Sequence, residues 1–377
     1  MIIGIDGNEA NVLNRVGVGQ FAYNVIFQLE KNDKNNSHII YLKEAPKDDF
    51  PKEREGWSYK VFGPSNLWTQ ISLPIKLFTQ KEKLSVFYSP SHYAPRFSPV
   101  PGVISIMDLW HHHHPEQFAK KDLYQLTNWE KYSVKKAEHI ITISEFSKKD
   151  IMDIYHVPSA KITVAYPGFV QFKVQSEKFK VEETKKKYGI VGDYFLYIGT
   201  LQPKKNIEGL IKAFNILNTK YKIQNTKLII AGKKGWHYEK IFELVKQLQF
   251  EDKVVFTGFV SEEDKPYLLA GAIAFVFPSF YEGFGIPVLE AMSLKVPVIT
   301  SGEGSLPEVG GEAAIYCNPY EVDSIAGAME KIINLKEKGR NEIISKGLEQ
   351  INKFSWEKCA KKVLEALEKT KDVKENY

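Results

Sequence analysis

Residues 278–290 read PSFYEGFGIPVLE and directly follow the apolar run 273–277. A short apolar run that passes through a glycine turn into a helix with an early proline is typical of a parallel α/β sheet. Gly283 and Gly285 let backbone N–H groups approach a ligand closely, and the helix N-terminus beyond them favours anions. The stretch therefore predicts an α/β fold with a ligand site at this turn.

The same alternation of apolar runs and helix-period segments extends along the chain. We expect strands at 1–6, 38–42, 85–88, 102–106, 140–143, 194–198, 227–231, 254–257, 273–277 and 296–300. We expect helices at 19–31, 120–138, 147–155, 206–220, 238–248, 261–269, 287–294 and 355–369. This order predicts two doubly wound, Rossmann-like domains with mainly parallel sheets.

A change of composition separates the two expected domains. After Pro167-Gly168 the chain becomes polar and rich in lysine and glutamate as far as Lys187. We place the domains at residues 1–172 and 173–355, with residues 356–377 forming a further helix. Since ligands of such sheets bind at the carboxyl ends of the strands, we expect the two domains to face a central cleft.

The composition excludes several classes of protein. The chain has 377 residues, of which 43% are hydrophobic and 26% charged, so it is not a disordered chain. The net charge of +5 is small and no basic block occurs, so we expect no nucleic-acid partner. Cys317 and Cys359 are too few for a disulfide framework. The N-terminus lacks a basic signal-peptide region and no apolar run reaches a membrane span, so we expect a cytoplasmic protein.

Two carboxylates flank the glycine turn. Glu282 lies on the loop and Glu290 in the first turns of the expected helix, with seven residues between them. Carboxylates accept hydrogen bonds from sugar hydroxyls, while backbone N–H groups suit phosphate, so the pair suits a nucleotide sugar. The alternative is a tight turn whose glutamate only complements the helix dipole.

A lysine pair precedes the helix expected at 206–220. Lys205 stands immediately before Asn206, a good N-cap, so its ammonium and the helix N-terminus can meet the same diphosphate. The alternative is that Lys204 and Lys205 are a solvated surface pair. As an exposed lysine, Lys205 is expected to contribute little to stability.

Five ordered segments give the chain a family resemblance. They are 15–19 (RVGVG), 199–206 (GTLQPKKN), 258–261 (GFVS), 282–290 (EGFGIPVLE) and 305–309 (SLPEV). Together they resemble the glycosyltransferases of the GT4 family (glycosyltransferase group 1), which have the GT-B fold and retain the anomeric configuration. The likeness covers essentially the whole chain. It is strongest over residues 194–311 and looser before residue 100.

The resemblance implies a metal-independent hexosyltransferase with catalytic Glu282 and Lys205. It implies a C-terminal domain that binds the donor and an N-terminal domain that binds the acceptor, with the helix 356–377 crossing back to the N-terminal domain. It implies donor contacts from Gly17, Gly19, Gly199, Thr200, Lys204, Lys205, Lys233, Gly258, Val260, Gly283, Phe284, Gly285 and Glu290. Many relatives carry arginine at the position of Thr200. One cation for the phosphates is therefore absent or is replaced by Lys204 or Lys233.

The glycine loop near the N-terminus has a second interpretation. Residues 17–22 fit the dinucleotide pattern G-x-G-x-x-A. About ten residues separate the loop from the first strand, however, whereas the dinucleotide fingerprint lies directly in the first βα turn. We therefore favour a flexible loop in which Gly17 and Gly19 approach the sugar diphosphate.

Four consecutive histidines, His111, His112, His113 and His114, suggest a metal site. In an extended segment neighbouring side chains point to opposite faces, and no nearby carboxylate pattern completes a zinc set, so we expect no bound metal. Relatives often have a His-Asp pair where this chain has Met107 and Asp108. Asp108 or His111 is the candidate to replace the missing catalytic histidine.

The expected substrates follow from the resemblance. The GTLQPKKN form resembles family members that use GDP-mannose to build surface polysaccharides, with a saccharide or polyprenyl-linked acceptor. No cofactor is expected beyond the nucleotide sugar. The lysines of helix 120–138 suggest peripheral membrane contact, or else a solvated basic face. Alternatives are a UDP-sugar donor, a NAD-dependent dehydrogenase with Glu44 as its acidic residue, and a non-catalytic nucleotide-sugar binder.

Overall fold

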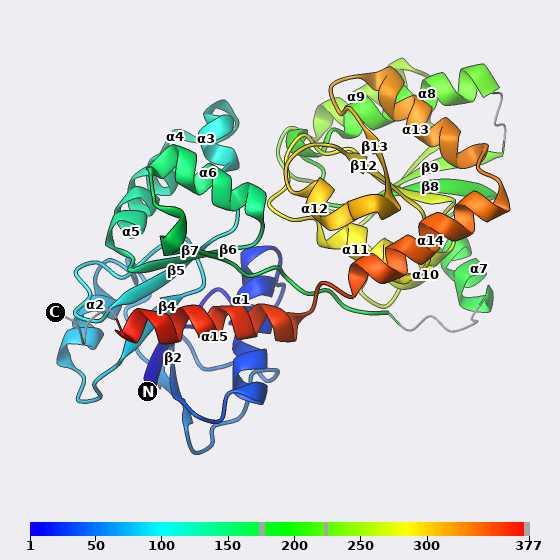
Figure 1. Ribbon diagram of the computed structural model, residues 1–377. Coiled ribbons are helices and arrows are strands. Elements are labelled where there is room, and N and C mark those ends of the chain that lie inside the picture. Colours follow the sequence, from blue (N-terminus) through cyan, green and yellow to red (C-terminus); the bar gives the residue numbers. More distant parts are fainter. Residues whose placement is uncertain (173–177, 222–224, 373–377) are drawn as a thin grey trace. The chain divides into compact units, whose positions relative to one another are not determined.

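The computed structural model describes residues 1–172, 178–221 and 225–372 of the chain. These residues form two compact units, each built on its own sheet (Figure 1). Unit 1 comprises Met1–Gly168 and the C-terminal segment from Phe354, and unit 2 comprises Phe169–Lys353.

Unit 1 contains a parallel sheet of seven strands in the order β3-β2-β1-β4-β5-β6-β7. The strands are β1 (Ile2–Asp6), β2 (Ser37–Leu42), β3 (Trp57–Val61), β4 (Val86–Ser89), β5 (Gly102–Ile106), β6 (His139–Thr142) and β7 (Ile162–Val164). Its helices are α1 (Val18–Asn32), α2 (Ser72–Thr79), α3 (Trp110–His113), α4 (Lys120–Tyr124), α5 (Glu130–Lys136), α6 (Glu145–Tyr155) and α15 (Trp356–Asp372). Helices on both faces bury the central strands, which explains their nearly continuous apolar runs.

Unit 2 contains a parallel sheet of six strands in the order β10-β9-β8-β11-β12-β13. The strands are β8 (Asp193–Ile198), β9 (Thr226–Ala231), β10 (Val254–Gly258), β11 (Ala274–Phe277), β12 (Val298–Ser301) and β13 (Ala314–Cys317). Its helices are α7 (Lys178–Lys187), α8 (Ile207–Tyr221), α9 (Glu239–Gln247), α10 (Lys265–Ala270), α11 (Ile286–Ser293), α12 (Leu306–Gly310), α13 (Val322–Ile333) and α14 (Glu337–Ile351). The strand order reverses between β8 and β11, which is where ligands of doubly wound sheets bind.

The predicted fold class is confirmed, and one predicted helix is corrected. The segment expected to be one helix over 120–138 consists of α4, a π-helical turn at Gln125–Trp129, and α5. A π turn takes in one extra residue and shifts the face that the following residues present. The shift precedes Glu130, which is fully buried.

The C-terminal helix α15 packs on unit 1, beside α1 (Figure 1). Trp356 meets the ring of Phe21 edge to face, with 6.2 Å between the ring centroids. The backbone at Gly168 passes so close to Trp356 that a Cβ on this glycine would lie 2.1 Å from the Trp356 nitrogen. Glycine is therefore required at position 168.

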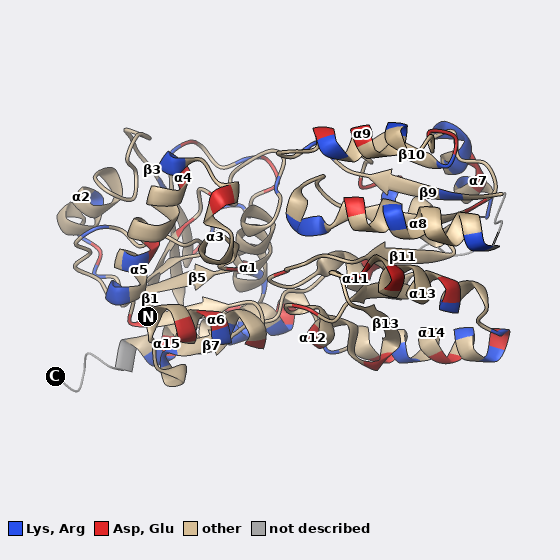
Figure 2. Cartoon of the chain, turned by 90° about the horizontal axis from the view of Figure 1, so that it is seen from above, with Lys and Arg blue, Asp and Glu red and all other residues tan. Residues whose placement is uncertain are grey.

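Among the described residues, charges of both signs are mixed along the surface helices. Lysine, arginine and acidic residues alternate along α9 and α14 (Figure 2), as expected for solvated helix faces. Within the described residues, no helix is both long enough and apolar enough to cross a membrane.

Candidate functional site

The loop after β8 carries Lys205 at the switch point of the unit 2 sheet. A 3₁₀ turn, Pro203–Lys205, leads to Asn206, whose φ of 53° is tolerated better by asparagine than by most residues. Asn206 does not adopt the extended backbone of the expected N-cap. Its side-chain amide instead donates to the carbonyls of Pro278, at 3.2 Å, and Pro319, at 2.6 Å. The residue thus joins the Lys205 turn to the loop after β11.

The loop after β11 is held by a serine that the sequence did not single out for this role. Ser305 Oγ lies 2.9 Å from the carbonyl oxygen of Glu282 and 2.8 Å from that of Phe284. Gly285, with φ of 116°, then starts α11, and Pro287 occupies its first turn as predicted. These contacts fix the backbone on which Glu282 is mounted.

Lys205 and Glu282 form an ion pair between the two loops. Lys205 Nζ lies 2.5 Å from Glu282 Oε1, and the side chains are only 13% and 9% exposed. The ammonium also lies 5.0 Å from the centroid of the Phe277 ring. The expectation that Lys205 is an exposed lysine is therefore wrong, because the turn after β8 faces the buried loop after β11.

A second ion pair involves Glu290, whose partner the sequence did not reveal. Lys265 Nζ, from α10, lies 2.9 Å from Glu290 Oε1 and 2.8 Å from Glu262 Oε2. Burial raises the pKa of Glu290, and the Lys265 ammonium partly opposes this shift. Burial acts to lower the pKa of Lys265, but the two carboxylates raise it above its usual value. No local signal in the sequence connects residues 25 positions apart on different helices.

The other donor-binding candidates of unit 2 lie on the same edge of its sheet. They lie in the segments that follow β8, β9, β10 and β11, or, for Gly258, at the last residue of β10: Gly199, Thr200 and Lys204; Lys233; Gly258 and Val260; Gly283, Phe284 and Gly285. Gly232 packs so closely on Gly199 that a Cβ would lie 1.9 Å from the Gly199 oxygen. Lys233 is exposed and lies 4.6 Å from the centroid of the Phe259 ring.

Four further candidates lie in unit 1. Gly17, with φ of 50°, caps α1, and a Cβ on Gly19 would lie 2.7 Å from the Glu9 carbonyl oxygen. Asp108 follows β5 and accepts a hydrogen bond of 3.1 Å from the backbone of Trp110. The fourth candidate, His111, is buried.

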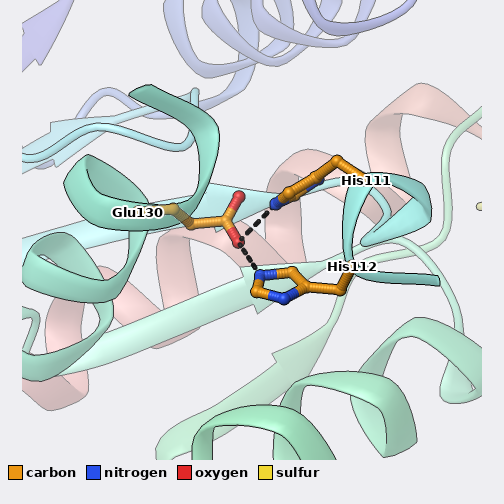
Figure 3. Close-up of side chains that lie close together, drawn as sticks. All are labelled: His111, His112 and Glu130. Atoms are coloured by element: carbon orange, nitrogen blue, oxygen red, sulfur yellow. Dashed lines mark ion pairs between the residues drawn. The ribbon is translucent and has the colours of Figure 1, made fainter. Parts of the chain in front are cut away.

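The histidine run is helical, which corrects two expectations. Residues Trp110–His113 form α3, so His111 and His112 do not point to opposite faces. Both rings point toward Glu130 (Figure 3), with His111 Nε2 at 3.5 Å and His112 Nε2 at 3.9 Å from Glu130 Oε1. The carboxylate missing from the sequence pattern is therefore present, contributed by α5.

Glu130 is fully buried and has two further polar neighbours. His92 Nδ1 lies 2.7 Å from Oε2, and the Tyr155 hydroxyl donates to Oε1 at 2.5 Å. Burial acts to raise the pKa of Glu130, but His111 and His92 lower it to about 2. Burial acts to lower the pKa of His92, whereas Glu130 raises it above its usual value. The carboxylate is thus held ionised among imidazoles.

Family models match both units of the chain. Residues 178–350 match the model described as "Glycosyl transferases group 1", and residues 16–170 match the model described as "Glycosyltransferase Family 4". The two matches leave only short segments uncovered.

Two curated relatives carry mannosyltransferase names. O-antigen chain mannosyltransferase B of Escherichia coli is 35% identical over 259 residues, which cover 67% of this chain and 65% of that protein. O-antigen chain mannosyltransferase RfbU of Salmonella typhimurium is 32% identical over 234 residues, which cover 62% of this chain and 61% of that protein. The matched part is less than two thirds of either relative.

Solved structures share the fold over nearly the whole chain. Anabaena Alr3699/HepE, in complex with UDP and glucose, has a TM-score of 0.74 at 18% identity and covers 97% of this chain and 99% of its own. WaaG, a glycosyltransferase involved in lipopolysaccharide biosynthesis, has a TM-score of 0.70 at 15% identity, with coverage of 97% and 99%. With both units matched by family models and two parallel sheets in the GT-B arrangement of strands, the chain belongs to the group 1 glycosyltransferases and is a GT4-like member with the GT-B fold.

Proposed function

We propose that the chain is a retaining, metal-independent hexosyltransferase. It moves mannose from GDP-mannose to a saccharide or lipid-linked acceptor in the synthesis of a surface polysaccharide. The observation that carries the proposal is the Lys205–Glu282 pair, which lies at the switch point of the unit 2 sheet. The mannosyltransferase names of two relatives support the choice of sugar and process.

The Lys205–Glu282 pair suits the diphosphate and the adjoining sugar of a nucleotide sugar. A donor that binds at this turn meets the Lys205 ammonium for its diphosphate and, directly beside it, the Glu282 carboxylate for its sugar hydroxyls. The N-terminus of α11 adds backbone N–H groups that favour anions. Lys204 and Lys233 are the proposed replacements for the cation that relatives have at Thr200.

The transfer needs charge stabilisation more than a covalent partner. The bond between the sugar and the phosphate breaks, and its electron pair leaves with the nucleoside diphosphate. The acceptor oxygen forms the new bond, and its proton passes to the departing phosphate. Because negative charge grows on that phosphate, Lys205 stabilises the transition state more than the bound donor. The likeness of residues 282–290 to the motif of retaining enzymes supports retention of configuration.

Glu290 is proposed to accept hydrogen bonds from the ribose of the donor. Lys265 holds its carboxylate in one place, at 2.9 Å. An oriented acceptor binds two neighbouring hydroxyls better than a free one, because less conformational entropy is lost on binding.

Unit 1 is proposed to bind the acceptor, and Gly17 and Gly19 are proposed as donor contacts. Two residues were candidates for the role of the missing histidine at Met107. Asp108 is partly exposed, whereas His111 is only 4% exposed and turned toward Glu130. This difference favours Asp108 as the group that borders the sugar.

The proposal is tested by nucleotide-dependent thermal shift and then by turnover. GDP and GDP-mannose at 100 times their dissociation constants should stabilise the protein by about 2.7 kcal/mol, whereas UDP and UDP-glucose should not. Glu290→Gln is the matched control, and at the same GDP concentration its stabilisation should fall to about half, roughly 1.4 kcal/mol, while the variant keeps its fold. Product formed from GDP-mannose, with its anomeric configuration read by NMR, would establish the reaction.

The rival outcomes are distinct. A shift with UDP-sugars alone would make the chain a UDP-sugar-dependent enzyme of the same fold. The structurally similar Alr3699/HepE was solved in complex with UDP and glucose. Binding of GDP-mannose without product, across a panel of mannose-terminated acceptors, would leave a non-catalytic binder. A shift with NAD alone would overturn the glycosyltransferase reading of the site.

A further inference from the structure

The cluster around Glu130 in unit 1 plays no part in the proposed transfer. Glu130 begins α5 directly after the π-helical turn Gln125–Trp129, and it is completely buried. Three chain segments converge on it, carrying His92, the pair His111 and His112, and Tyr155. A buried carboxylate surrounded by imidazoles is a costly arrangement that needs a physical reason.

The spacing of the donor atoms fits a single metal ion. Glu130 Oε1 lies 3.5 Å from His111 Nε2 and 3.9 Å from His112 Nε2, and all three atoms lie within 4.8 Å of one another. Two ligands bound tetrahedrally at about 2.0–2.1 Å from one zinc ion are roughly 3.3–3.5 Å apart. The two distances from Oε1 exceed this spacing by at most about 0.6 Å, and the separation of the two histidine nitrogens exceeds it by at most about 1.5 Å, so side-chain rotations would place the three atoms around one ion (Figure 3).

His111 supplies an independent observation. Its Nε2 atom is buried and has no hydrogen-bond partner among the described residues, although it faces the carboxylate. The whole residue is 4% exposed, so water does not satisfy this nitrogen freely. A buried nitrogen without a hydrogen bond is destabilising, and a metal ion is a partner that it can take as a neutral imidazole.

The surrounding hydrogen bonds would orient the ligands. His92 Nδ1 holds Glu130 Oε2 at 2.7 Å, which leaves Oε1 directed at the other two histidines. The Tyr155 hydroxyl donates to Oε1 and lies 2.7 Å from His112 Nε2, a contact that a metal would replace. Such outer contacts fix a ligand's direction and strengthen metal binding. The His112 side chain is 23% exposed, which gives an ion a way in.

We propose that His111, His112 and Glu130 form a binding site for a zinc-class divalent ion. Two imidazoles and one carboxylate suit zinc and its first-row neighbours rather than magnesium or calcium, which prefer all-oxygen sites. Three protein ligands leave a fourth position for water. The site belongs to unit 1 and does not rest on the proposed function, in which the cations for the diphosphate come from unit 2.

The test uses the full chain without a polyhistidine tag. Protein is stripped with EDTA, dialysed, and titrated with ZnCl₂ by calorimetry, and Co²⁺ is added separately to record its visible absorption. We expect one equivalent of Zn²⁺ and the strong visible bands of four-coordinate Co²⁺. MgCl₂ should give no saturable binding.

The run of four histidines provides a matched control. His113 and His114 have side chains 41% exposed and pair with Asp150 and Glu116. The double variant H111A/H112A should bind Zn²⁺ at least 100-fold more weakly, whereas H113A/H114A should bind it as the wild type does. Circular dichroism checks that each variant is folded.

Two results would overturn the proposal. One is wild-type protein that takes up no stoichiometric Zn²⁺, and the other is an equal loss of affinity in both double variants. If H111A/H112A does not fold, the single variant H112A replaces it, because this side chain is partly exposed and its loss leaves the buried pair intact. Unchanged Zn²⁺ affinity in a folded H112A would also defeat the assignment.

Discussion

The two units surround their buried carboxylates with different partners. In unit 2, Glu282 and Glu290 each have a lysine partner, at 2.5 and 2.9 Å. In unit 1, Glu130 has histidines and a tyrosine instead. A lysine carries a fixed positive charge at neutral pH, whereas a neutral histidine offers a lone pair.

This difference separates two kinds of chemistry. The lysine partners of unit 2 can attract phosphate but cannot bind a metal ion, because a protonated ammonium has no lone pair. The neutral histidines of unit 1 can bind a metal ion through their lone pairs, but they carry no charge that would attract phosphate. The sequence motifs of the family contain Lys205, Glu282 and Glu290, while Glu130 and its histidine neighbours lie outside them. Four predictions probe this division, in order of decreasing effect.

The largest effect is expected for Lys205→Ala. Removing one preorganised cation from the departing diphosphate should lower turnover by about 10²–10³-fold. The variant should also lose about 1–3 kcal/mol of unfolding free energy, because Glu282 remains buried without its partner. Turnover with the true donor and a thermal melt measure the two effects.

Two variants make this prediction specific. Lys204→Ala is the neighbouring control and should be milder. The double variant Lys205→Met with Glu282→Gln should recover the stability but not the turnover. Equal, small losses of turnover in the two alanine variants would show that the phosphates are held elsewhere.

The next effect concerns the stability of unit 2. Lys265→Met leaves Glu290 buried and unpaired, so we expect a loss of about 2 kcal/mol, less than for a completely buried pair since 12% of the Lys265 side chain is exposed. Removing the exposed carboxylate by Glu262→Gln should change stability little. Chemical denaturation followed by intrinsic fluorescence compares them, and identical midpoints would mean that the pair is not a stabilising contact.

A smaller effect is expected for Glu290→Gln. An amide is a weaker acceptor than a carboxylate, so binding of the donor nucleotide should weaken about tenfold. The fold should survive, because Lys265 keeps Glu262 as a partner at 2.8 Å. Calorimetric titration with GDP measures the affinity. Unchanged affinity together with a lower melting temperature would make Glu290 a structural residue.

The smallest effect is expected on removal of metal. Turnover in excess EDTA, measured well below the melting temperature, should stay within about twofold of the untreated value, because the proposed phosphate cations are lysines. Melting temperature is the contrasting readout, since loss of an ion from unit 1 should lower it. Abolished turnover that returns with Zn²⁺ would move the histidine cluster into the catalytic machinery.

Local patterns predicted the elements that are buried on both sides. β1, β5 and β8 were visible as apolar runs, and the alternation of strands with helices gave the fold class. The edge strand β3 was not predicted, because Trp57 is its only buried residue and the strand carries no apolar run. Helix α2 was missed as well, since Pro74 interrupts a segment of only eight residues.

The candidate site likewise contains residues that local sequence predicts and residues that it does not. Lys205 and Glu282 were singled out from their own turns, and the order of strands brings these turns together. Lys265 and Glu130 were not, because each is defined by a contact to a residue remote in sequence. The histidine run was expected to be extended, but it forms a helical turn. Four identical residues have no periodic pattern that would indicate a helix.

The return of α15 to unit 1 has a consequence for biosynthesis. Cys359 and Trp356 contact Ala165 and Gly168, so the chain closes unit 1 only after all of unit 2 has been made. Unit 2 is continuous in sequence and can fold as soon as it leaves the ribosome. Until residue 372 emerges, the surface of unit 1 that receives α15 is bare, and Phe21 lacks its Trp356 contact. Unit 1 is thus the first unit to be synthesised and the last to be completed. A chain that is truncated before α15 contains all of unit 2 but lacks the helix that completes unit 1.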